Sequence, residues 1–164
     1  MDEKILQCLN ELIALDLACA AAYEVARGVS RDEEIQGTFS AFREDHLRHV
    51  AELGEHVRRA GIEPPRELDT KGEIIRAFTT LASQEDRTAV LVMRGNEELS
   101  NNAYASALRA GLPEEIRARV AANFEDARQH MSWMRGTVLL RGWDVEQPEI
   151  RELSAEARGA RKAA

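Results

Sequence analysis

The feature that most constrains this chain is an internal repeat with an offset of 81 residues. Side chains of the first half recur 81 positions later, unchanged or in a similar form. The matching pairs include Asp2 and Ser83, Asp16 and Glu97, Tyr23 and Tyr104, Ala26 and Ala107, Ile35 and Ile116, Asp45 and Asp126, His49 and His130, Val57 and Val138, and Gly61 and Gly142. Because the offset continues across a turn, both halves contain the same elements with the same lengths, as duplication of one structural unit produces.

The repeated unit is predicted to be a helical hairpin. Apolar residues recur at alternating steps of four and three, which marks the buried face of a helix. The composition agrees, because Ala, Leu, Glu and Arg are abundant and lose little rotamer freedom in a helix. The expected helices are residues 3–27, 32–61, 83–110 and 113–142. Asp2 and Ser83 are the expected N-caps, with Asp86 completing a variant of the capping box. Gly28 and Gly61 are expected to end the first two helices.

These helices predict an all-α protein with one domain, residues 1–164. Two antiparallel hairpins joined by a long connection are typical of a four-helix bundle. The predicted parts are a first hairpin (2–61), a crossover (62–82), a second hairpin (83–142) and a tail (143–164). The crossover contains a proline pair that breaks the helix before it and a short helix at 73–81. A short C-terminal helix is expected at 149–161.

Charge and cysteine content limit the partners and the compartment. The net charge of −7 argues against nucleic acid, because phosphate contacts need clustered Lys and Arg. Cys8 and Cys19 share one predicted helix and are about 16 Å apart at 1.5 Å per residue, too far for a disulfide. The acidic N-terminus lacks the basic-then-apolar order of a signal peptide, and no apolar run approaches about 20 residues. We therefore expect a cytoplasmic protein without a membrane partner.

Ionisable residues interrupt the predicted apolar faces in one zone. The five residues are Asp16, His46, His49, Glu97 and His130, all near the middle of their helices. Buried carboxylates and imidazoles are costly unless they are paired or bind a ligand. Asp16 and His46 lie at similar distances from the hairpin turn and can face each other. The five residues are therefore predicted to converge at one level of the bundle.

This combination resembles the ferritin-like superfamily of rubrerythrins and bacterioferritins over roughly residues 3–142. In that pattern two helices each supply a carboxylate and two each supply Glu-x-x-His. The resemblance assigns the single carboxylates to Asp16 and Glu97, and the Glu-x-x-His positions to His46-x-x-His49 and Ala127-x-x-His130. The stretch from Arg94 to Glu97, Tyr104 and the pair Leu112-Pro113 are similar to a bacterial ferritin-like family of unknown function.

The departures from that pattern bear on the metal. His46 and Ala127 stand where the resemblance implies glutamates that bridge two irons. Two carboxylates and three imidazoles supply too little negative charge for a standard di-iron centre, but imidazole suits a single transition-metal ion such as iron or zinc. Asp45 and Asp126 lie one position away from the apolar face of their helices and are predicted to orient the histidines.

Two functions remain compatible with these residues. The first is a ferritin-like protein that binds a metal ion at Asp16, His46, His49, Glu97 and His130, with little or no ferroxidase activity. The second is a non-catalytic bundle with a degenerate metal site, which acts as a homodimer or through a partner protein of unknown identity. The tail residues Trp143, Val145, Ile150 and Leu153 motivate the second function, since they offer an apolar face. No phosphate loop, CxxC pair or nucleophile elbow indicates another chemistry.

Overall fold

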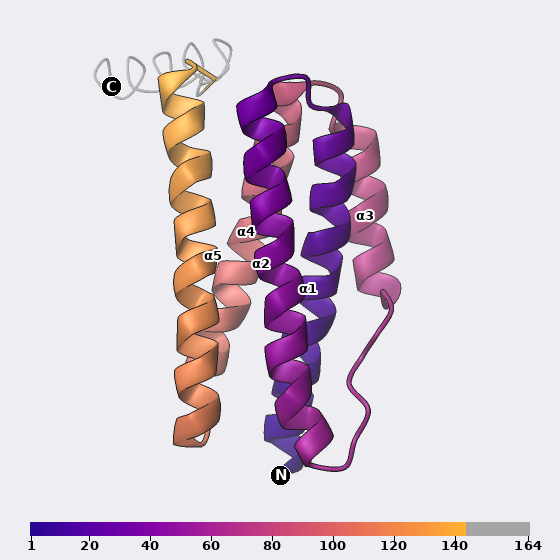
Figure 1. Ribbon diagram of the computed structural model, residues 1–164, viewed down its shortest axis with the longest axis vertical. Helices are drawn as coiled ribbons and strands as arrows, with labels where there is room; N and C mark the ends of the chain where they lie inside the picture. Colours follow the sequence, from indigo (N-terminus) through magenta and orange to yellow (C-terminus); the bar gives the residue numbers. More distant parts are fainter. Residues whose placement is uncertain (144–164) are drawn as a thin grey trace, which may run out of the picture.

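The structure is a computed structural model that describes residues 1–143. The described chain folds into helices only and contains no strand, which confirms the predicted all-α class. The helices are α1 (Glu3–Val29), α2 (Glu33–Arg59), α3 (Thr70–Ala82), α4 (Asp86–Leu108) and α5 (Glu114–Leu140) (Figure 1). The predicted C-terminal helix and the tail residues Val145, Ile150 and Leu153 lie outside the described residues, and the single-domain organisation over 1–164 stays a prediction.

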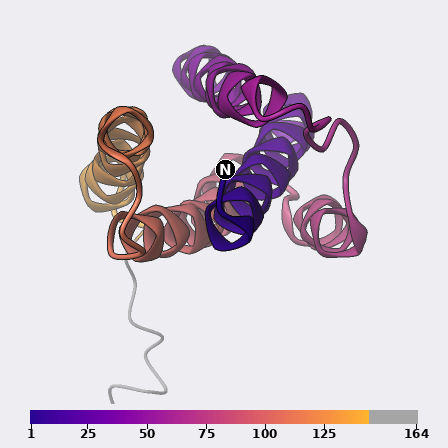
Figure 2. The same cartoon turned by 90° about the horizontal axis from the view of Figure 1, so that it is seen from below.

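Four helices form a bundle, and the fifth lies outside it. α1 packs against α2, and α4 packs against α5, so each predicted hairpin is present. α1 and α4 pack against each other and join the hairpins, while α2 and α5 approach each other less closely. Seen along the helices, α2, α1, α4 and α5 follow one another around the bundle, and α3 lies beside α1 on the outside (Figure 2).

Capping residues explain most helix ends. Asp2 is the N-cap of α1, as predicted, and its carboxylate accepts a hydrogen bond from the Lys4 backbone N–H at 2.8 Å. Gly61 and Gly142 follow α2 and α5 with φ of 77° and 66°, a left-handed conformation that glycine adopts without steric cost. Gly28 does not end α1, which continues to Val29.

The predicted N-cap at Ser83 is wrong. Ser83 follows the last residue of α3, and its backbone N–H donates to the carbonyl of Thr79. α4 starts three residues later than predicted, with Glu85 as its N-cap and Thr88 as the reciprocal partner of a capping box. The reason is that α3 continues to Ala82, one residue beyond the predicted 73–81, so Ser83 caps the end of α3. The carboxylate of Asp69 accepts a hydrogen bond from the Gly72 N–H at 2.7 Å and starts that helix early.

Helix α1 is more apolar than predicted. α1 is long and apolar enough to cross a membrane, with a mean hydropathy of 1.6 over 18 residues, half of which are buried. A core helix passes the same test, and α1 packs against α2, α3 and α4. The bundle core therefore accounts for the apolar side chains of α1.

The core has two apolar clusters along the bundle axis. The first is built around Tyr23, Phe39, Met93 and Met134. The second contains Leu9, Leu53, Val120 and Tyr104. Residues of both clusters come from both hairpins, so the hairpins share one interior. Between the two clusters lies a layer of buried ionisable side chains.

Candidate metal centre

The structure brings the five predicted residues together from four helices. Asp16 lies on α1, His46 and His49 on α2, Glu97 on α4 and His130 on α5. Four of the side chains are fully buried, and His130 is 1 % exposed. Convergence at one level of the bundle is therefore present in the fold, whereas the metal-binding role stays a prediction.

His46 occupies the centre of this group. Its Nδ1 lies 2.8 Å from Oδ1 of Asp16, and its Nε2 lies 3.0 Å from Oε1 of Glu97. Burial alone would lower the pKa of His46, but the Glu97 charge and the Asp16 hydrogen bond outweigh it and raise the pKa to about 10. Without a metal, the ring is therefore an imidazolium that donates one N–H to each carboxylate.

Two tyrosines hold the carboxylates in a reciprocal arrangement. The Tyr23 hydroxyl donates to Glu97, and the Tyr104 hydroxyl donates to Oδ2 of Asp16 at 2.6 Å. Tyr104 is the repeat equivalent of Tyr23, and Glu97 is the repeat equivalent of Asp16, so each pair joins the two hairpins, as an approximate two-fold relation between them requires. Burial and the adjacent carboxylate charge raise the pKa of both tyrosines well above the ordinary value, so both remain donors.

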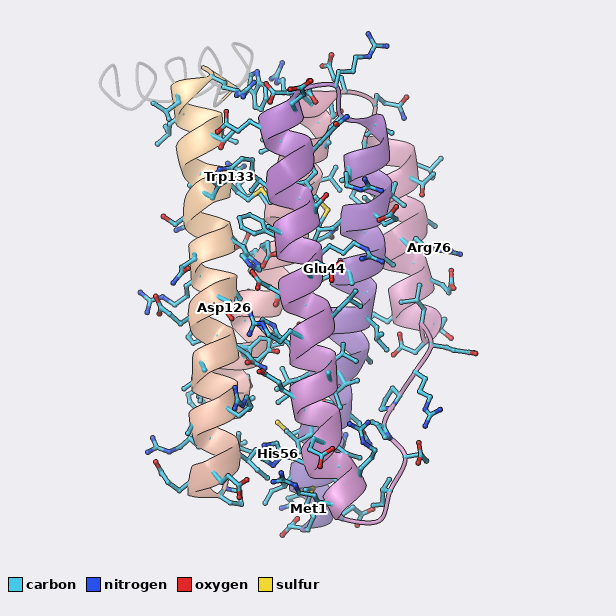
Figure 3. The ribbon with its side chains drawn as sticks, viewed as in Figure 1. Met1, Glu44, His56, Arg76, Asp126 and Trp133 are labelled. Atoms are coloured by element: carbon cyan, nitrogen blue, oxygen red, sulfur yellow. The ribbon has the colours of Figure 1, made fainter. Side chains whose placement is uncertain are left out.

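The outer nitrogens of two histidines show the same reciprocity. Nε2 of His49 lies 3.1 Å from Oδ2 of Asp126, and Nε2 of His130 lies 3.0 Å from Oδ2 of Asp45. Each aspartate thus contacts the histidine of the opposite hairpin. Arg48 lies between the two aspartates and donates to both. Asp126 is labelled at mid-height of α5 in Figure 3.

The inner nitrogens of these histidines face the buried carboxylates. Nδ1 of His130 lies 3.1 Å from Oε1 of Glu97, and Nδ1 of His49 lies 3.6 Å from Oδ1 of Asp16. His49 has the usual arrangement of a metal ligand, because its outer nitrogen contacts a carboxylate and its inner nitrogen has no hydrogen-bond partner, whereas the inner nitrogen of His130 contacts Glu97. The predicted contacts of Asp45 and Asp126 with the histidines are therefore present, but they cross between hairpins, which the sequence did not indicate.

The donor atoms fit a metal ion in number and spacing. Two sets, Asp16–His46–His49 and His46–Glu97–His130, have ligand atoms that all lie within 4.8 Å of one another. Tetrahedral ligands bound at about 2.0–2.1 Å are about 3.3 Å apart, and the closest contacts here range from 2.8 to 3.6 Å. Nδ1 of His49 and Oε2 of Glu97 are buried without a hydrogen-bond partner in the described chain. Such atoms are costly to bury unless a ligand binds them.

Some other polar residues near the cluster could have been identified from the sequence, and others could not. Arg48 was missed, because it lies off the buried helix face and periodicity gives no signal for it. Asn123 was also missed as a site residue. It is fully buried beside Tyr104, and a polar residue on an apolar seam is the signal that identified the other five. His56 is partly exposed and lies near the far end of α2 (Figure 3).

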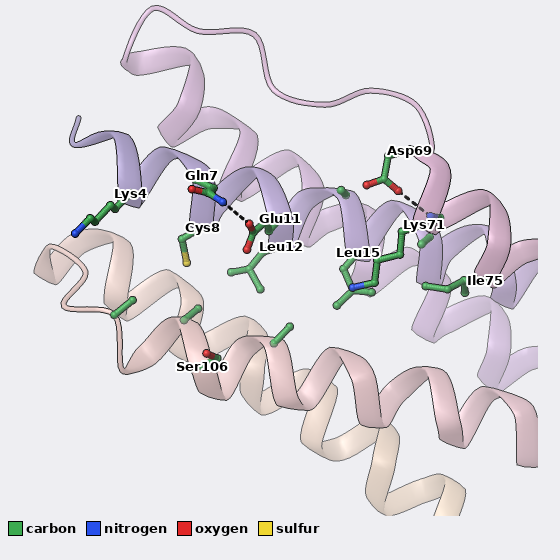
Figure 4. Close-up of a pocket in the computed structure, with 16 residues that line it drawn as sticks. Lys4, Gln7, Cys8, Glu11, Leu12, Leu15, Asp69, Lys71, Ile75 and Ser106 are labelled. Carbon is green, nitrogen blue, oxygen red and sulfur yellow. Dashed lines mark hydrogen bonds between the residues drawn. The ribbon is translucent and has the colours of Figure 1, made fainter.

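A separate groove lies between α1, α4 and the start of α3. Its volume is about 450 Å³, and Cys8, Leu12 and Lys71 are among the side chains that line it (Figure 4). None of the five clustered residues lines this groove. The five clustered side chains are instead enclosed by the bundle.

Comparison with known proteins identifies a family. No curated protein matches the chain. Residues 4–110 match a family described as a domain of unknown function, DUF2383. The matched stretch is more than half of the chain and includes Asp16, His46, His49 and Glu97. The chain therefore belongs to the DUF2383 family.

Proposed function

We propose that this protein is ferritin-like and binds a transition-metal ion, iron or zinc, in the core of its bundle. The ligands are Asp16, His46, His49, Glu97 and His130. The observation that carries the proposal is the unpartnered Nδ1 of His49, which lies 3.6 Å from Asp16 while Asp126 holds its outer nitrogen. A buried imidazole with its outer nitrogen held and its inner nitrogen unpartnered is oriented to bind a cation.

The arrangement of the helices supports the ferritin-like part of the proposal. The two hairpins are joined by a long connection that contains α3, and each hairpin contributes one carboxylate from its first helix and histidine from its second. The thiols of Cys8 and Cys19 are both free, which supports a reducing, cytoplasmic setting.

Metal analysis tests the proposal directly. Protein purified without a histidine tag is stripped with a chelator and titrated with Zn²⁺ and Fe²⁺ under anaerobic conditions. We expect tight binding by the native protein and by His56→Ala, and strongly weakened binding by His49→Ala. If the native protein binds neither ion, the buried histidines serve only as hydrogen-bonded core residues.

The missing bridging glutamates lead to a prediction about catalysis. Oxygen chemistry at two irons needs anionic oxygen ligands to balance the charge in a low-dielectric core. We therefore expect aerobic Fe²⁺ oxidation by the native protein to stay close to the protein-free rate. The double variant His46→Glu plus Ala127→Glu completes Glu-x-x-His on α2 and α5 and is expected to raise the rate at least tenfold.

Controls for that assay concern folding. Ala127 is fully buried, so a larger side chain there costs about 1–3 kcal/mol. Circular dichroism and thermal unfolding must first show that the variant is folded. Rapid iron oxidation by the native protein would contradict the proposal of low ferroxidase activity. A folded double variant that binds no iron would contradict the assignment of these helices to the ferritin-like pattern.

A different observation supports the second function, self-association or partner binding. Three large apolar side chains on one face of α3 are exposed: Ile74 (64 %), Phe78 (60 %) and Leu81 (77 %). Their spacing of four and three places them along a single stripe. Light scattering of the native protein and of Phe78→Ser tests this function. A native dimer that becomes a monomer in Phe78→Ser supports self-association through this face. A monomeric native protein excludes the homodimer.

A further inference from the structure

The cluster consists of two overlapping sets of ligands that share one residue. We infer that the site holds two divalent metal ions bridged by the His46 ring, which binds one ion through Nδ1 and the other through Nε2. This inference rests on the proposed function and specifies the number of ions and the bridge between them. Metal–nitrogen bonds of about 2.0–2.1 Å on either side of the ring place the ions about 6 Å apart.

The first argument is the direction of the two ring nitrogens. Nδ1 of His46 points at the Asp16 side of the cluster, and Nε2 points at the Glu97 side. A histidine that binds a single ion offers one nitrogen to it and the other to a supporting carboxylate or carbonyl. Here both nitrogens face carboxylates that themselves belong to ligand sets, so neither side is merely a support.

The second argument is that each subsite has its own complete surroundings. Around one subsite are Asp16 and Nδ1 of His49, whose outer nitrogen is held by Asp126. Around the other are Glu97 and Nδ1 of His130, whose outer nitrogen is held by Asp45. These two environments correspond residue by residue through the 81-residue repeat. A single ion would occupy only one of these two ligand environments.

The third argument is charge. When two divalent ions bind, His46 releases both ring protons to solvent and becomes an imidazolate, and each nitrogen lone pair forms one metal bond. No group is oxidised or reduced. His49 and His130 bind as neutral rings that keep their outer protons. The positive charge is then balanced by Asp16, Glu97, the imidazolate, Asp45 and Asp126, with Arg48 as the remaining cation. A neutral cluster is the arrangement that a buried site tolerates best.

The repeat explains why a single histidine can bridge both subsites. Position 127, equivalent to 46, is a fully buried alanine. His46 contacts both members of the equivalent pair Asp16 and Glu97, so it lies close to the axis that relates the hairpins. One ring near this axis can therefore serve both subsites.

The experiment combines stoichiometry with a spectroscopic test of the bridge. Full-length untagged protein is stripped of metal, loaded with Zn²⁺ or Cu²⁺, and dialysed, and the bound metal is measured by mass spectrometry. Cu²⁺ is the spectroscopic probe, because histidine sites bind it tightly and an imidazolate couples two Cu²⁺ spins. The variants are His49→Ala, His130→Ala and His46→Gln, with His56→Ala as the matched control on α2.

We expect two ions per chain in the native protein and in His56→Ala, and half that amount in His49→Ala and in His130→Ala. The dicopper protein should lose most of its electron paramagnetic resonance intensity at liquid-helium temperature, whereas copper bound to His46→Gln should keep the full intensity of isolated ions. The native measurements alone decide the question if a variant fails to fold.

Each other outcome has a distinct meaning. One ion per native chain overturns the two-ion site but leaves the proposed function intact. Two ions with full, uncoupled resonance intensity overturn the His46 bridge. Bound copper that persists when His49 and His130 are both replaced by alanine is adventitious surface binding and also overturns the inference. No bound ion in the native protein overturns the proposed function itself.

Discussion

Helices α2 and α5 correspond through the repeat, yet α2 brings two histidines into the core and α5 brings one. His49 and His130 have equivalent surroundings, because each contacts a buried carboxylate on one side and an aspartate of the other hairpin on the opposite side. His46 has no counterpart, since Ala127 occupies the equivalent position. The difference shows that duplication repeats contacts away from the axis, whereas one side chain near the axis can contact both halves at once.

The largest expected effect comes from changing the position where the hairpins differ. In metal-free protein, His46→Ala leaves Asp16 and Glu97 buried without their shared cation. Breaking a buried ion pair in this way costs about 3–5 kcal/mol of unfolding free energy. The matched change Ala127→Gly on α5 should cost only about 1 kcal/mol, the helix-propensity difference. Urea unfolding in the presence of a chelator measures both, and similar costs would contradict the central role of His46.

The stability difference between the native protein and His46→Ala can also be measured as a function of pH. The folded pKa of His46, about 10, lies above the ordinary 6.5, so its stabilising contribution is complete below pH 6.5 and is lost as the pH rises to about 10. The difference in unfolding free energy between native protein and His46→Ala should therefore shrink over this range. A difference that stays constant from pH 6.5 to 10 would show that His46 is not charged in the folded, metal-free state.

The tyrosines test whether the equivalent contacts are equal in energy. Tyr23→Phe and Tyr104→Phe each remove one hydroxyl that donates to a buried carboxylate. Hydrogen bonds to charged groups contribute about 1.5–3 kcal/mol, so each variant should lose that much stability, and the two losses should agree. Thermal unfolding of both variants checks this. A clearly larger loss for one tyrosine would mean that the hairpins are symmetric in geometry but not in energy.

The smallest expected effect concerns the outer aspartates. Asp45→Asn and Asp126→Asn weaken the support of His130 and His49 while leaving the inner ligands in place. Loss of such a partner lowers metal affinity about 10- to 100-fold, and the repeat predicts similar losses for both variants. Competition with a zinc indicator measures the affinities. Glu115→Gln is the control, because Glu115 pairs with Arg59 between α2 and α5 but away from the histidines; an equal loss there would point to a general effect of charge.

Much of the fold was predictable because it depends on local chemistry. The step of three and four positions sets the buried face of each helix, and Asp2, Gly61 and Gly142 mark helix ends through their own backbone preferences. The start of α4 was not predictable in this way. Ser83 and Glu85 can both cap a helix, and the end of α3 at Ala82, which makes Ser83 its C-cap, decides between them.

The sequence by itself determined which residues enter the core layer. Asp16, His46, His49, Glu97 and His130 lie on buried helix faces at matching heights, and helical periodicity together with the repeat is sufficient to place them there. The tertiary structure alone decided which atoms meet. Tyr23 with Glu97, His49 with Asp126 and the central position of His46 depend on how one hairpin is rotated against the other. That rotation is set by packing between residues distant in sequence, and no local pattern encodes it.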